Sequence, residues 1–284
     1  DRNVYAWGDN TYGQLGNDKT TATISTPVHV KSSDGTYLTG ISMVSGGANH
    51  VIAMSNTNDI YAWGDNSKAQ YHEVANTHVA NKITDKDSLN PENDDVFTSF
   101  SRVTAGWNYS VILTNNGYLW ALGNNTYGQL GDGTYGTSNV DKFVPRQVRI
   151  GQNESNTKLL TNIKYVAAGA NSSAAIDQDG LLYVWGNNDN GQLGVDGKIV
   201  AYPTLVEALK DNPATPNADE TILVSAVELS ESHTIIIDAL TKRAYTWGKN
   251  DHNQLGYQQS ILNNGKPMTS PSTENYAKEA HLVT

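Results

Sequence analysis

The feature that most constrains the fold is a segment that the chain repeats five times. In the first copy, residues 4–16 read Val-Tyr-Ala-Trp-Gly-Asp-Asn-Thr-Tyr-Gly-Gln-Leu-Gly, and related segments begin near residues 60, 119, 182 and 244. Between the residues that precede the first Gly of each copy, the steps are 56, 59, 63 and 62 residues. A recurring period of this kind indicates a repeat architecture. We therefore expect residues 1–284 to form one domain, or a fragment of one, built from similar units.

The repeated segment predicts strands. In Tyr-Ala-Trp-Gly the large residues are two positions apart with a small residue between them, which suits a pleated sheet. In the third copy Trp120 takes the Tyr position and Leu122 takes the Trp position, so bulk is kept and its placement is exchanged. The following Asn-x-x-Gly-Gln-Leu-Gly is typical of a loop, because Asn and Gly tolerate a left-handed backbone.

A second motif precedes each later copy, at residues 44–53, 103–113, 166–176 and, more loosely, 227–237. It consists of a strand of small residues, a tight turn and an apolar strand, and a hairpin turn then leads into the Trp-Gly strand. Candidates for a fourth strand lie at residues 27–30, 144–148 and 203–206. Four short strands per repeat of about sixty residues predict an all-β propeller of four-stranded antiparallel blades.

On these motifs the chain resembles the regulator of chromosome condensation (RCC) repeat family, whose signature combines a Trp-Gly strand end, an Asn-x-x-Gly-Gln-Leu-Gly loop and a Gly-x-x-His turn. Four of the five loops keep Gln-Leu-Gly; the second has Ser67-Lys68-Ala69-Gln70-Tyr71 instead, and only His50 and His233 keep the His. The resemblance implies a ring of seven blades. We count four complete blades and a lone strand at each end, residues 4–7 and 280–284.

This count predicts that the ring is not whole within the chain, which favours a piece of a longer protein. A smaller closed ring and strand exchange between chains are the alternatives. The absence of Cys excludes disulfides, thiolate metal sites and Cys nucleophiles. An acidic, Cys-free chain rich in Asn, Thr, Asp and Tyr favours a bacterial-type member that is secreted or exposed on the cell surface; a cytoplasmic or nuclear location is the alternative.

The charge balance argues against a nucleic-acid partner. The chain has 19 Lys and Arg against 29 Asp and Glu, a net charge of −10, and lacks the basic clusters that bind phosphates. No apolar run approaches the roughly 18 residues that a membrane span needs.

Motifs of catalysis are also absent from the sequence. It contains no Gly-x-Ser-x-Gly, no phosphate-binding loop ahead of a helix and no His-x-x-x-His pair. His72, Glu73 and His78 share one loop, but a spacing of six on a loop is a weak basis for a metal site. We expect no catalytic residue, no cofactor and no metal, and hence a protein that is not an enzyme.

Two groups of residues are expected to be structural. The aromatic residues of the repeated strand should pack between neighbouring sheets, and the two family His residues should tie their turns by hydrogen bonds. These residues are Tyr5, Trp7, Tyr61, Trp63, Trp120, Tyr183, Trp185, Tyr245 and Trp247, with His50 and His233.

Partner binding is predicted at the turn between the two inner strands. Trp107 and Tyr109 lie there, and turn tips on one face of a propeller project into solvent, where aromatic residues anchor interfaces. The alternative is that Trp107 folds back over the propeller mouth. The predicted binding residues are Trp107, Asn108 and Tyr109, the equivalent Asn49, Asn171 and Glu231, and a second element with Tyr71, His72 and His78.

The sequence thus predicts a non-enzymatic scaffold that binds a protein, or a glycan, through loops on one face. Two other functions stay open. The resemblance implies a guanine-nucleotide exchange factor for a Ran-type small GTPase, with the insertion at residues 67–97 as a wedge. Open blade edges would instead suit a structural surface protein that assembles with itself.

Overall fold

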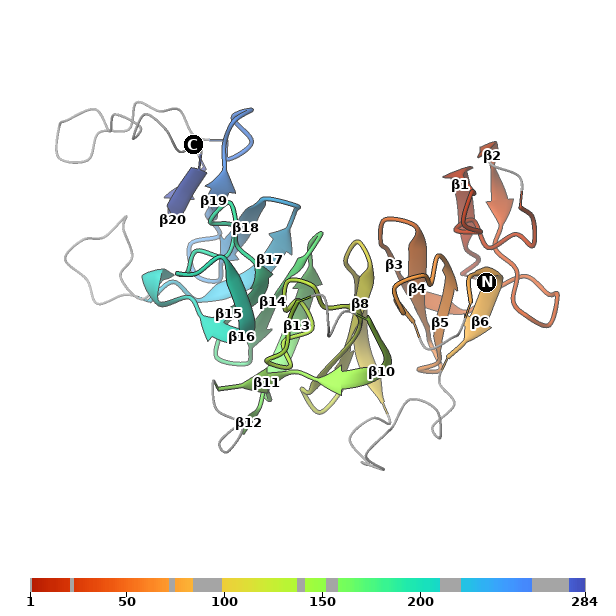
Figure 1. Ribbon diagram of the computed structural model, residues 1–284, viewed down its shortest axis with the longest axis horizontal. Helices are drawn as coiled ribbons and strands as arrows, with labels where there is room; N and C mark the ends of the chain where they lie inside the picture. Colours follow the sequence, from red (N-terminus) through yellow and green to blue (C-terminus); the bar gives the residue numbers. More distant parts are fainter. Residues whose placement is uncertain are drawn as a thin grey trace.

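The computed structural model describes residues 2–20, 23–71, 75–83, 99–136, 141–151, 158–209, 221–256 and 276–283. Sheets stand side by side along an open arc, with the N-terminal and C-terminal sheets at its opposite ends (Figure 1). Apart from strands, the described residues form one short 3₁₀ helix, η1 (Glu207–Leu209). None of the described segments is a helix long and apolar enough to cross a membrane.

Five sheets, which we number I to V in chain order, make up the arc. Sheet I pairs β1 (Tyr5–Asp9) with β2 (Thr23–His29). Sheet II contains β3 (Ile41–Gly46), β4 (His50–Ser55), β5 (Ile60–Gly64) and β6 (Thr77–Lys82). Sheet III contains β7 (Phe100–Ala105), β8 (Tyr109–Thr114), β9 (Leu119–Asn124) and β10 (Asp141–Gln147). Sheet IV contains β13 (Ile163–Ala168), β14 (Ser172–Asp177), β15 (Leu182–Asn187) and β16 (Ile199–Leu205). Sheet V contains β17 (Val224–Leu229), β18 (His233–Asp238), β19 (Ala244–Lys249) and β20 (Tyr276–Leu282). A small pair, β11 (Arg149–Ile150) and β12 (Lys158–Leu159), connects sheets III and IV.

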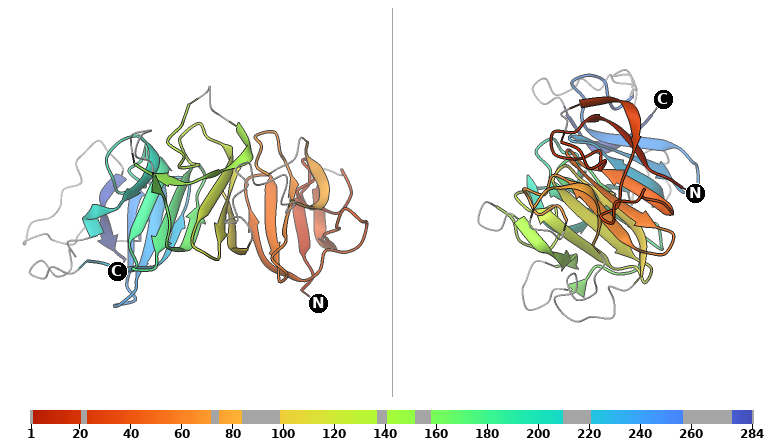
Figure 2. Two further views of the ribbon diagram at one scale, coloured as in Figure 1. Left: turned by 90° about the horizontal axis from the view of Figure 1, so that it is seen from below. Right: turned by 90° about the vertical axis from the view of Figure 1, so that its right-hand side faces the viewer.

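Within each four-stranded sheet, the strands pair antiparallel in the order in which they occur along the chain. The first strands of neighbouring sheets contact one another: β3 contacts β7, β7 contacts β13, and β13 contacts β17. The first strands therefore lie on the inner side of the arc (Figure 1), and the edge-on view shows the sheets standing one beside the next as blades (Figure 2). The predicted all-β propeller of four-stranded antiparallel blades is confirmed.

The ends of the chain differ from the prediction. A lone strand was expected at each end, but β1 pairs with β2, and β20 pairs with β19 as the fourth strand of sheet V. Sheet I corresponds to the third and fourth strands of the other sheets, because its Tyr-Ala-Trp-Gly aligns with that of β5. The insertion at residues 67–97 also supplies a blade strand, β6, and its residues 72–74 and 84–97 lie outside the described part.

In sheets II, IV and V the glycine of the Trp-Gly pair is required by a close backbone approach, whereas a Cβ atom on Gly8 of sheet I would meet no atom within 4 Å. Gly64, Gly186 and Gly248 have φ angles of 96°, 106° and 106°, in the region that favours glycine. A Cβ atom on Gly64 would lie 2.4 Å from the carbonyl oxygen of Asn49, in the turn that opens the second strand. The Trp-Gly motif thus holds the end of the third strand against that turn.

Candidate binding face

One edge of the arc combines the turns between first and second strands with the loops that follow the third strands. Backbone hydrogen bonds join the two in each four-stranded sheet. The N–H of Asp65 donates to the carbonyl of Asn49 (2.8 Å), and that of Asn124 to the carbonyl of Asn108 (2.9 Å). The same bond links Asn187 to Asn171 and Lys249 to Ser232. We call this edge, formed by residues 47–49, 106–108, 169–171 and 230–232 and the adjoining loops, the turn face.

All five loops of the turn face share one hydrogen-bond pattern, the unusual second loop included. The side-chain oxygen of the loop Asn accepts a bond from the N–H five residues later, as from Asn10 to Leu15 (3.0 Å). In the second loop Asn66 accepts it from Tyr71 (3.0 Å), and Ala69 takes the place of the Gly with a φ of 58°. The loop geometry therefore survives the loss of Gly-Gln-Leu-Gly.

This equivalence corrects the predicted second binding element. Tyr71 occupies the position of the buried Leu, is itself fully buried, and its hydroxyl donates to the carbonyl of Gly64 (2.8 Å). His78 is half-buried in β6, where its ring packs closely on Gly13. His72 lies outside the described residues. Tyr71 is thus a core residue. Within the part of the chain that the structure describes, no three His, Asp or Glu side chains gather as a metal site would require.

Each boundary between sheets uses the loop Gln carbonyl as an acceptor. At three of them a hydroxyl on the second strand of the following sheet donates to it: Ser110 to Gln70 (2.7 Å), Ser173 to Gln129 (3.0 Å) and Thr234 to Gln192 (2.5 Å). The indole N–H of Trp63 donates to the carbonyl of Gln14, and that of Trp185 to the carbonyl of Gln129, both at 2.9 Å. The Gln of the motif therefore joins consecutive sheets.

The motif Trp is buried only where a sheet precedes its own. Trp63 and Trp185 are 1% and 0% exposed and pack on Gly16 and Gly131, the last residues of the preceding loops. Trp247 is likewise buried and packs on Gly194. Trp7 is 63% exposed, so its predicted packing between sheets is wrong. Tyr5 is also exposed, for the same reason: sheet I stands at the end of the arc.

The boundary between sheets II and III is packed differently. Trp120 is buried, and Leu122 stands where the other sheets have Trp. Both belong to one buried cluster with Tyr71 of the preceding loop. In the first, third and fourth loops the motif Trp of the next sheet packs on the Gly that ends the loop. The second loop has no Gly after its Gln70-Tyr71 pair, so this packing contact is missing. At this boundary the large residue comes from the loop and the smaller one from the strand.

Tyr109 is not at the turn tip. Its side chain is fully buried, its hydroxyl donates to the carbonyl of Ser172 (2.5 Å) and it accepts a bond from the hydroxyl of Ser173 (3.0 Å). Burial raises the pKa of Tyr109. The sequence carried a signal for this: in Gly-x-x-His, Tyr109 stands at the His position, whereas Trp107 stands at the tip. A surface role for Tyr109 is therefore excluded.

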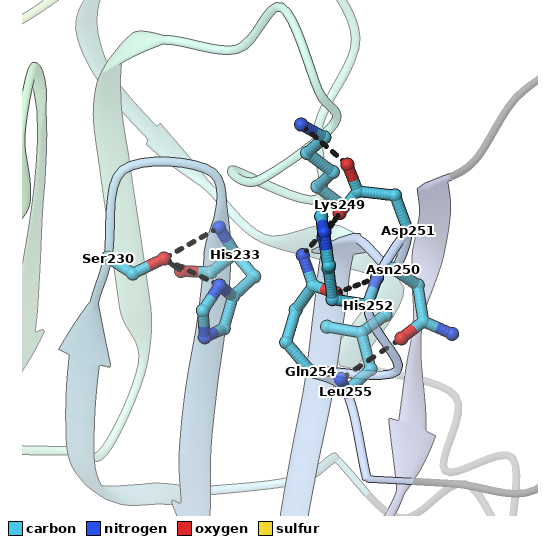
Figure 3. Close-up of polar contacts among 8 residues, drawn as sticks. All are labelled: Ser230, His233, Lys249, Asn250, Asp251, His252, Gln254 and Leu255. Atoms are coloured by element: carbon cyan, nitrogen blue, oxygen red, sulfur yellow. Dashed lines mark hydrogen bonds and ion pairs between the residues drawn. The ribbon is translucent and has the colours of Figure 1, made fainter.

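The two family His residues make different bonds. His50 is buried at the boundary between sheets II and III, and its Nε2 lies 3.1 Å from the hydroxyl of Ser110 in the next sheet. Burial lowers the pKa of His50 to about 4. His233 lies in the last sheet of the arc, and its Nδ1 lies 2.6 Å from the Ser230 hydroxyl of its own turn (Figure 3). Of the two, His233 bonds within its own turn and His50 bonds to the next sheet.

The loop next to His233 carries the charges of sheet V on the turn face. Lys249 and Asp251 form an ion pair of 2.8 Å, and His252 contacts the same carboxylate (Figure 3). The Lys249 ammonium holds the pKa of Asp251 below its usual range. In the first two loops the acid stands two residues earlier, as Asp9 and Asp65, where it accepts the backbone N–H two residues on. The first, second and fifth loops therefore each carry an Asp, which precedes the loop Asn in the first two and follows it in the fifth.

The tips of the four turns lie next to one another, and Trp107 is the large side chain among them. The N–H of Ala48 donates to the carbonyl of Trp107 (3.0 Å), and the N–H of Trp107 to the carbonyl of Ala170 (3.1 Å). Trp107 is 43% exposed, Ala48 and Glu231 are exposed, and Ala170 is buried. Asn49, Asn108 and Asn171, predicted as binding residues, are half-buried, and their carbonyls are used within the sheets.

Comparisons with known proteins agree with the architecture. The family described as the RCC1-like domain matches residues 1–278. The chain is 27% identical to the ultraviolet-B receptor UVR8 of Arabidopsis thaliana over 98% of its length and 56% of the receptor. It is 25% identical to the secretion-regulating guanine nucleotide exchange factor of Bos taurus over 89% of its length and 61% of that protein. It is also 29% identical to the protein RCC2 homolog of Xenopus laevis, over 78% of the chain and 43% of the relative.

The chain thus spans between 43% and 61% of the length of these relatives. They come from a plant, a mammal and an amphibian, so the expected bacterial origin and the secreted or surface location find no support in them. Among solved structures, yeast RCC1 (Prp20) bound to Kap60 superposes with a TM-score of 0.72 at 20% identity, covering 99% of this chain and 60% of Prp20. Human WBSCR16 superposes with a TM-score of 0.70 at 21% identity, covering 100% and 63%. At these identities the likeness concerns the fold.

Proposed function

The chain belongs to the family of RCC1-like domains, and on that premise we propose that it is a non-enzymatic propeller scaffold that binds a protein partner through the turn face. The observation that carries this proposal is the exposure of Trp107 at a turn tip. A rigid aromatic ring held on a strand hairpin can bury a large area at a small entropic cost, which is the usual chemistry of an interface anchor.

The rigidity of the tip supports this role. The backbone of Trp107 is bonded on both sides, to Ala48 of sheet II and to Ala170 of sheet IV, so its position is set by three sheets. The repeat demands no aromatic residue at this tip, because the equivalent positions carry Ala48, Ala170 and Glu231. An exposed Trp that no packing of the repeat requires is free to contact another molecule with a large apolar and hydrogen-bonding surface.

The charge of the turn face indicates the chemistry of the partner. Exposed acids lie on it in three sheets, at Asp9, Asp189, Glu231 and Asp251. A basic segment with an apolar recess for Trp107 would complement this face in both charge and shape. Association with such a partner should slow as salt is raised, because steering by exposed charges is screened.

A capture experiment with matched variants tests the proposal. Partners recovered on the immobilised wild-type chain are compared with those recovered on Trp107→Ala and on Leu240→Ala. Leu240 is 78% exposed and lies in the turn after β18, at the opposite edge of the arc, so it controls for loss of a surface apolar side chain. Trp107→Ala should weaken binding of a recovered partner at least ~10-fold, as for an anchor residue, and Leu240→Ala should not. Equal recovery of every partner by all three forms would show that Trp107 is not part of the binding site.

Guanine-nucleotide exchange is the second candidate, and it is favoured by the similarity to the exchange factor of Bos taurus. The assay is release of a fluorescent guanine nucleotide from a Ran-type GTPase. Acceleration by wild type that Trp107→Ala abolishes would make exchange the consequence of binding at the turn face. Acceleration that Trp107→Ala leaves intact would place the activity elsewhere on the propeller.

A further inference from the structure

Three polar side chains on the inner side of the arc form a row across sheets III, IV and V. Arg102 lies in β7, Tyr165 in β13 and Glu228 in β17, the first strands of these sheets. The Nη2 group of Arg102 donates to the hydroxyl of Tyr165 (3.0 Å), and that hydroxyl donates to a carboxylate oxygen of Glu228 (2.9 Å). The Tyr165 hydroxyl therefore stands between a cation and an anion.

The guanidinium group of Arg102 is held in a fixed orientation. Its central carbon lies 4.0 Å from the centroid of the Tyr165 ring, which is a cation–π contact. Its Nε–H donates to the main-chain carbonyl of Val166 (3.0 Å). Burial and the bond to Glu228 raise the pKa of the Tyr165 hydroxyl, so this hydroxyl stays protonated and keeps its place in the row. A ligand would thus meet a guanidinium that is already oriented, which lowers the entropic cost of binding.

The repeat does not require a charge at this position. The pairing register makes Met43, Tyr165 and Ala226 the equivalents of Arg102 in the other first strands. Between sheets II and III, the sulfur of Met43 accepts a bond from the N–H of Val103 (3.5 Å), so a neutral side chain can connect two neighbouring first strands. Connecting the sheets explains the contacts of Arg102 but does not explain its charge.

No carboxylate of the described residues touches the Arg102 guanidinium. None of the ion pairs among these residues includes Arg102, although its side chain is half-buried, where a charged group is usually paired. A guanidinium has five N–H groups, and within the described part of the chain Arg102 uses two of them, for Val166 and Tyr165. A bidentate carboxylate needs two N–H groups, and three are left.

We propose that Arg102 binds a single carboxylate group of a ligand at a second site, on the inner side of the arc and separate from the turn face. The planar fork of a guanidinium matches a carboxylate in shape as well as in charge. Two features favour a singly charged ligand over phosphate. The chain has a net charge of −10, which repels multiply charged anions, and the carboxylate of Glu228 lies just beyond Tyr165. The hydroxyl proton of Tyr165 is already bonded to Glu228, so the ligand is bound by Arg102 alone.

An NMR titration of the full chain with sodium acetate tests this site, with sodium chloride at equal ionic strength as the control. The amides of Val103 and Val166, next to the guanidinium in β7 and β13, report binding. Their shifts should saturate with a Kd in the millimolar range. Arg102→Lys keeps the charge and loses the planar fork, so it should bind acetate at least ~10-fold more weakly. Arg243→Lys makes the same change at an exposed Arg just before β19 and should bind acetate as wild type does.

A second measurement needs no variant and so does not depend on the folding of Arg102→Lys. Phenylglyoxal modifies accessible guanidinium groups, and mass mapping of peptides gives the rate at each Arg. With acetate at about ten times its Kd, the modification of Arg102 should slow about tenfold, because most molecules then carry the ligand. The exposed Arg243 should react at an unchanged rate.

A tripeptide with blocked ends, whose only carboxylate is an Asp side chain, separates two sources of the ligand. Tighter binding of this peptide than of acetate would assign the site to an acidic segment of a protein, and tighter binding of acetate would assign it to a small acid. Three results would overturn the proposal: shifts that do not saturate with acetate, equal binding by Arg102→Lys, or tighter binding of inorganic phosphate than of acetate.

Discussion

Trp7 and Trp185 occupy the same position of the same motif, at the end of the arc and inside it. Trp185 is fully buried, its indole N–H donates to the carbonyl of Gln129 and its ring packs on Gly131. Trp7 has the same strand and the same following glycine, and 63% of its surface is exposed. The difference shows that the motif places the side chain on one face of a sheet, while the preceding sheet decides whether that face is core or surface.

The same contrast separates the two His residues. His50 is buried against Ser110 of the following sheet, whereas no sheet of the described residues follows that of His233, which bonds to Ser230 of its own sheet. Repeat proteins are stabilised largely by the interfaces between neighbouring units. Variants at matched positions inside and at the end of the arc can therefore measure what a boundary contributes.

The largest difference is expected for the Trp pair. Trp185→Ala should lower the free energy of unfolding by about 3–5 kcal/mol, because it empties a large buried volume and leaves the Gln129 carbonyl without this donor. Trp7→Ala should cost less than about 1 kcal/mol, as an exposed substitution. Urea unfolding followed by circular dichroism measures both. Equal losses of unfolding free energy in the two variants would mean that Trp7 is covered in solution and is not at the surface.

Acid should distinguish the two His residues. The pKa of His50 is lowered by burial from 6.5 to about 4, so the neutral form is preferred in the folded chain. Stability is then complete above pH 6.5 and is lost as the pH falls toward 4, while the unfolded chain binds a proton and the folded chain does not. The loss attributable to His50 should approach about 3 kcal/mol.

The measurement is the slope of unfolding free energy against pH between 6.5 and 4. His50→Tyr, which copies Tyr109, should flatten this slope markedly. His233→Tyr should flatten it less, because the pKa of the half-buried His233 is lowered by a smaller burial. A slope unchanged by His50→Tyr would show that His50 titrates normally in the folded chain.

A smaller effect is expected from a single boundary hydroxyl. Thr234→Val removes the donor to the carbonyl of Gln192 in a buried site, and should cost about 1–2 kcal/mol. Thr204→Val, on an exposed position of β16, makes the same chemical change and should stay within about 0.5 kcal/mol. If both variants unfold at the same urea concentration, the Gln carbonyls do not contribute to the cohesion of neighbouring sheets.

The fold could be predicted because its information is local and repeated. Alternation within Tyr-Ala-Trp-Gly, the glycine positions and the recurrence of the motif each indicate strands and turns, and the repetition multiplies the signal. The fourth strands β6 and β20 were missed as blade strands because their sequences vary and β6 lies inside an insertion. Their pairing partners β5 and β19 contain the Trp-Gly motif, but β6 and β20 themselves contain no repeated motif.

The candidate site was harder to predict, since exposure depends on the neighbouring sheet. Tyr109 and Trp107 are two residues apart in one turn, and one is buried while the other is exposed. Only the alignment of Tyr109 with His50 and His233 separates them in the sequence. Tyr71 could likewise be recognised only by its alignment with the buried Leu of the other loops, because Gly-Gln-Leu-Gly is lost around it.

At the boundary between sheets II and III, Tyr71 replaces the usual loop Leu and Leu122 replaces the usual strand Trp, and this swap has a consequence for the order in which the sheets assemble. Repeats that resemble one another can stack in the wrong order during folding, a characteristic failure of repeat proteins. The loop that carries Tyr71 lacks the Gly on which a motif Trp packs at the other boundaries. The strand that carries Leu122 has a smaller side chain than Trp at this position, and the Leu of the other loops is too small to fill the remaining volume as Tyr71 does. These two surfaces therefore match each other better than they match any other unit of the chain. A single boundary with its own packing therefore fixes the order in which sheets II and III assemble.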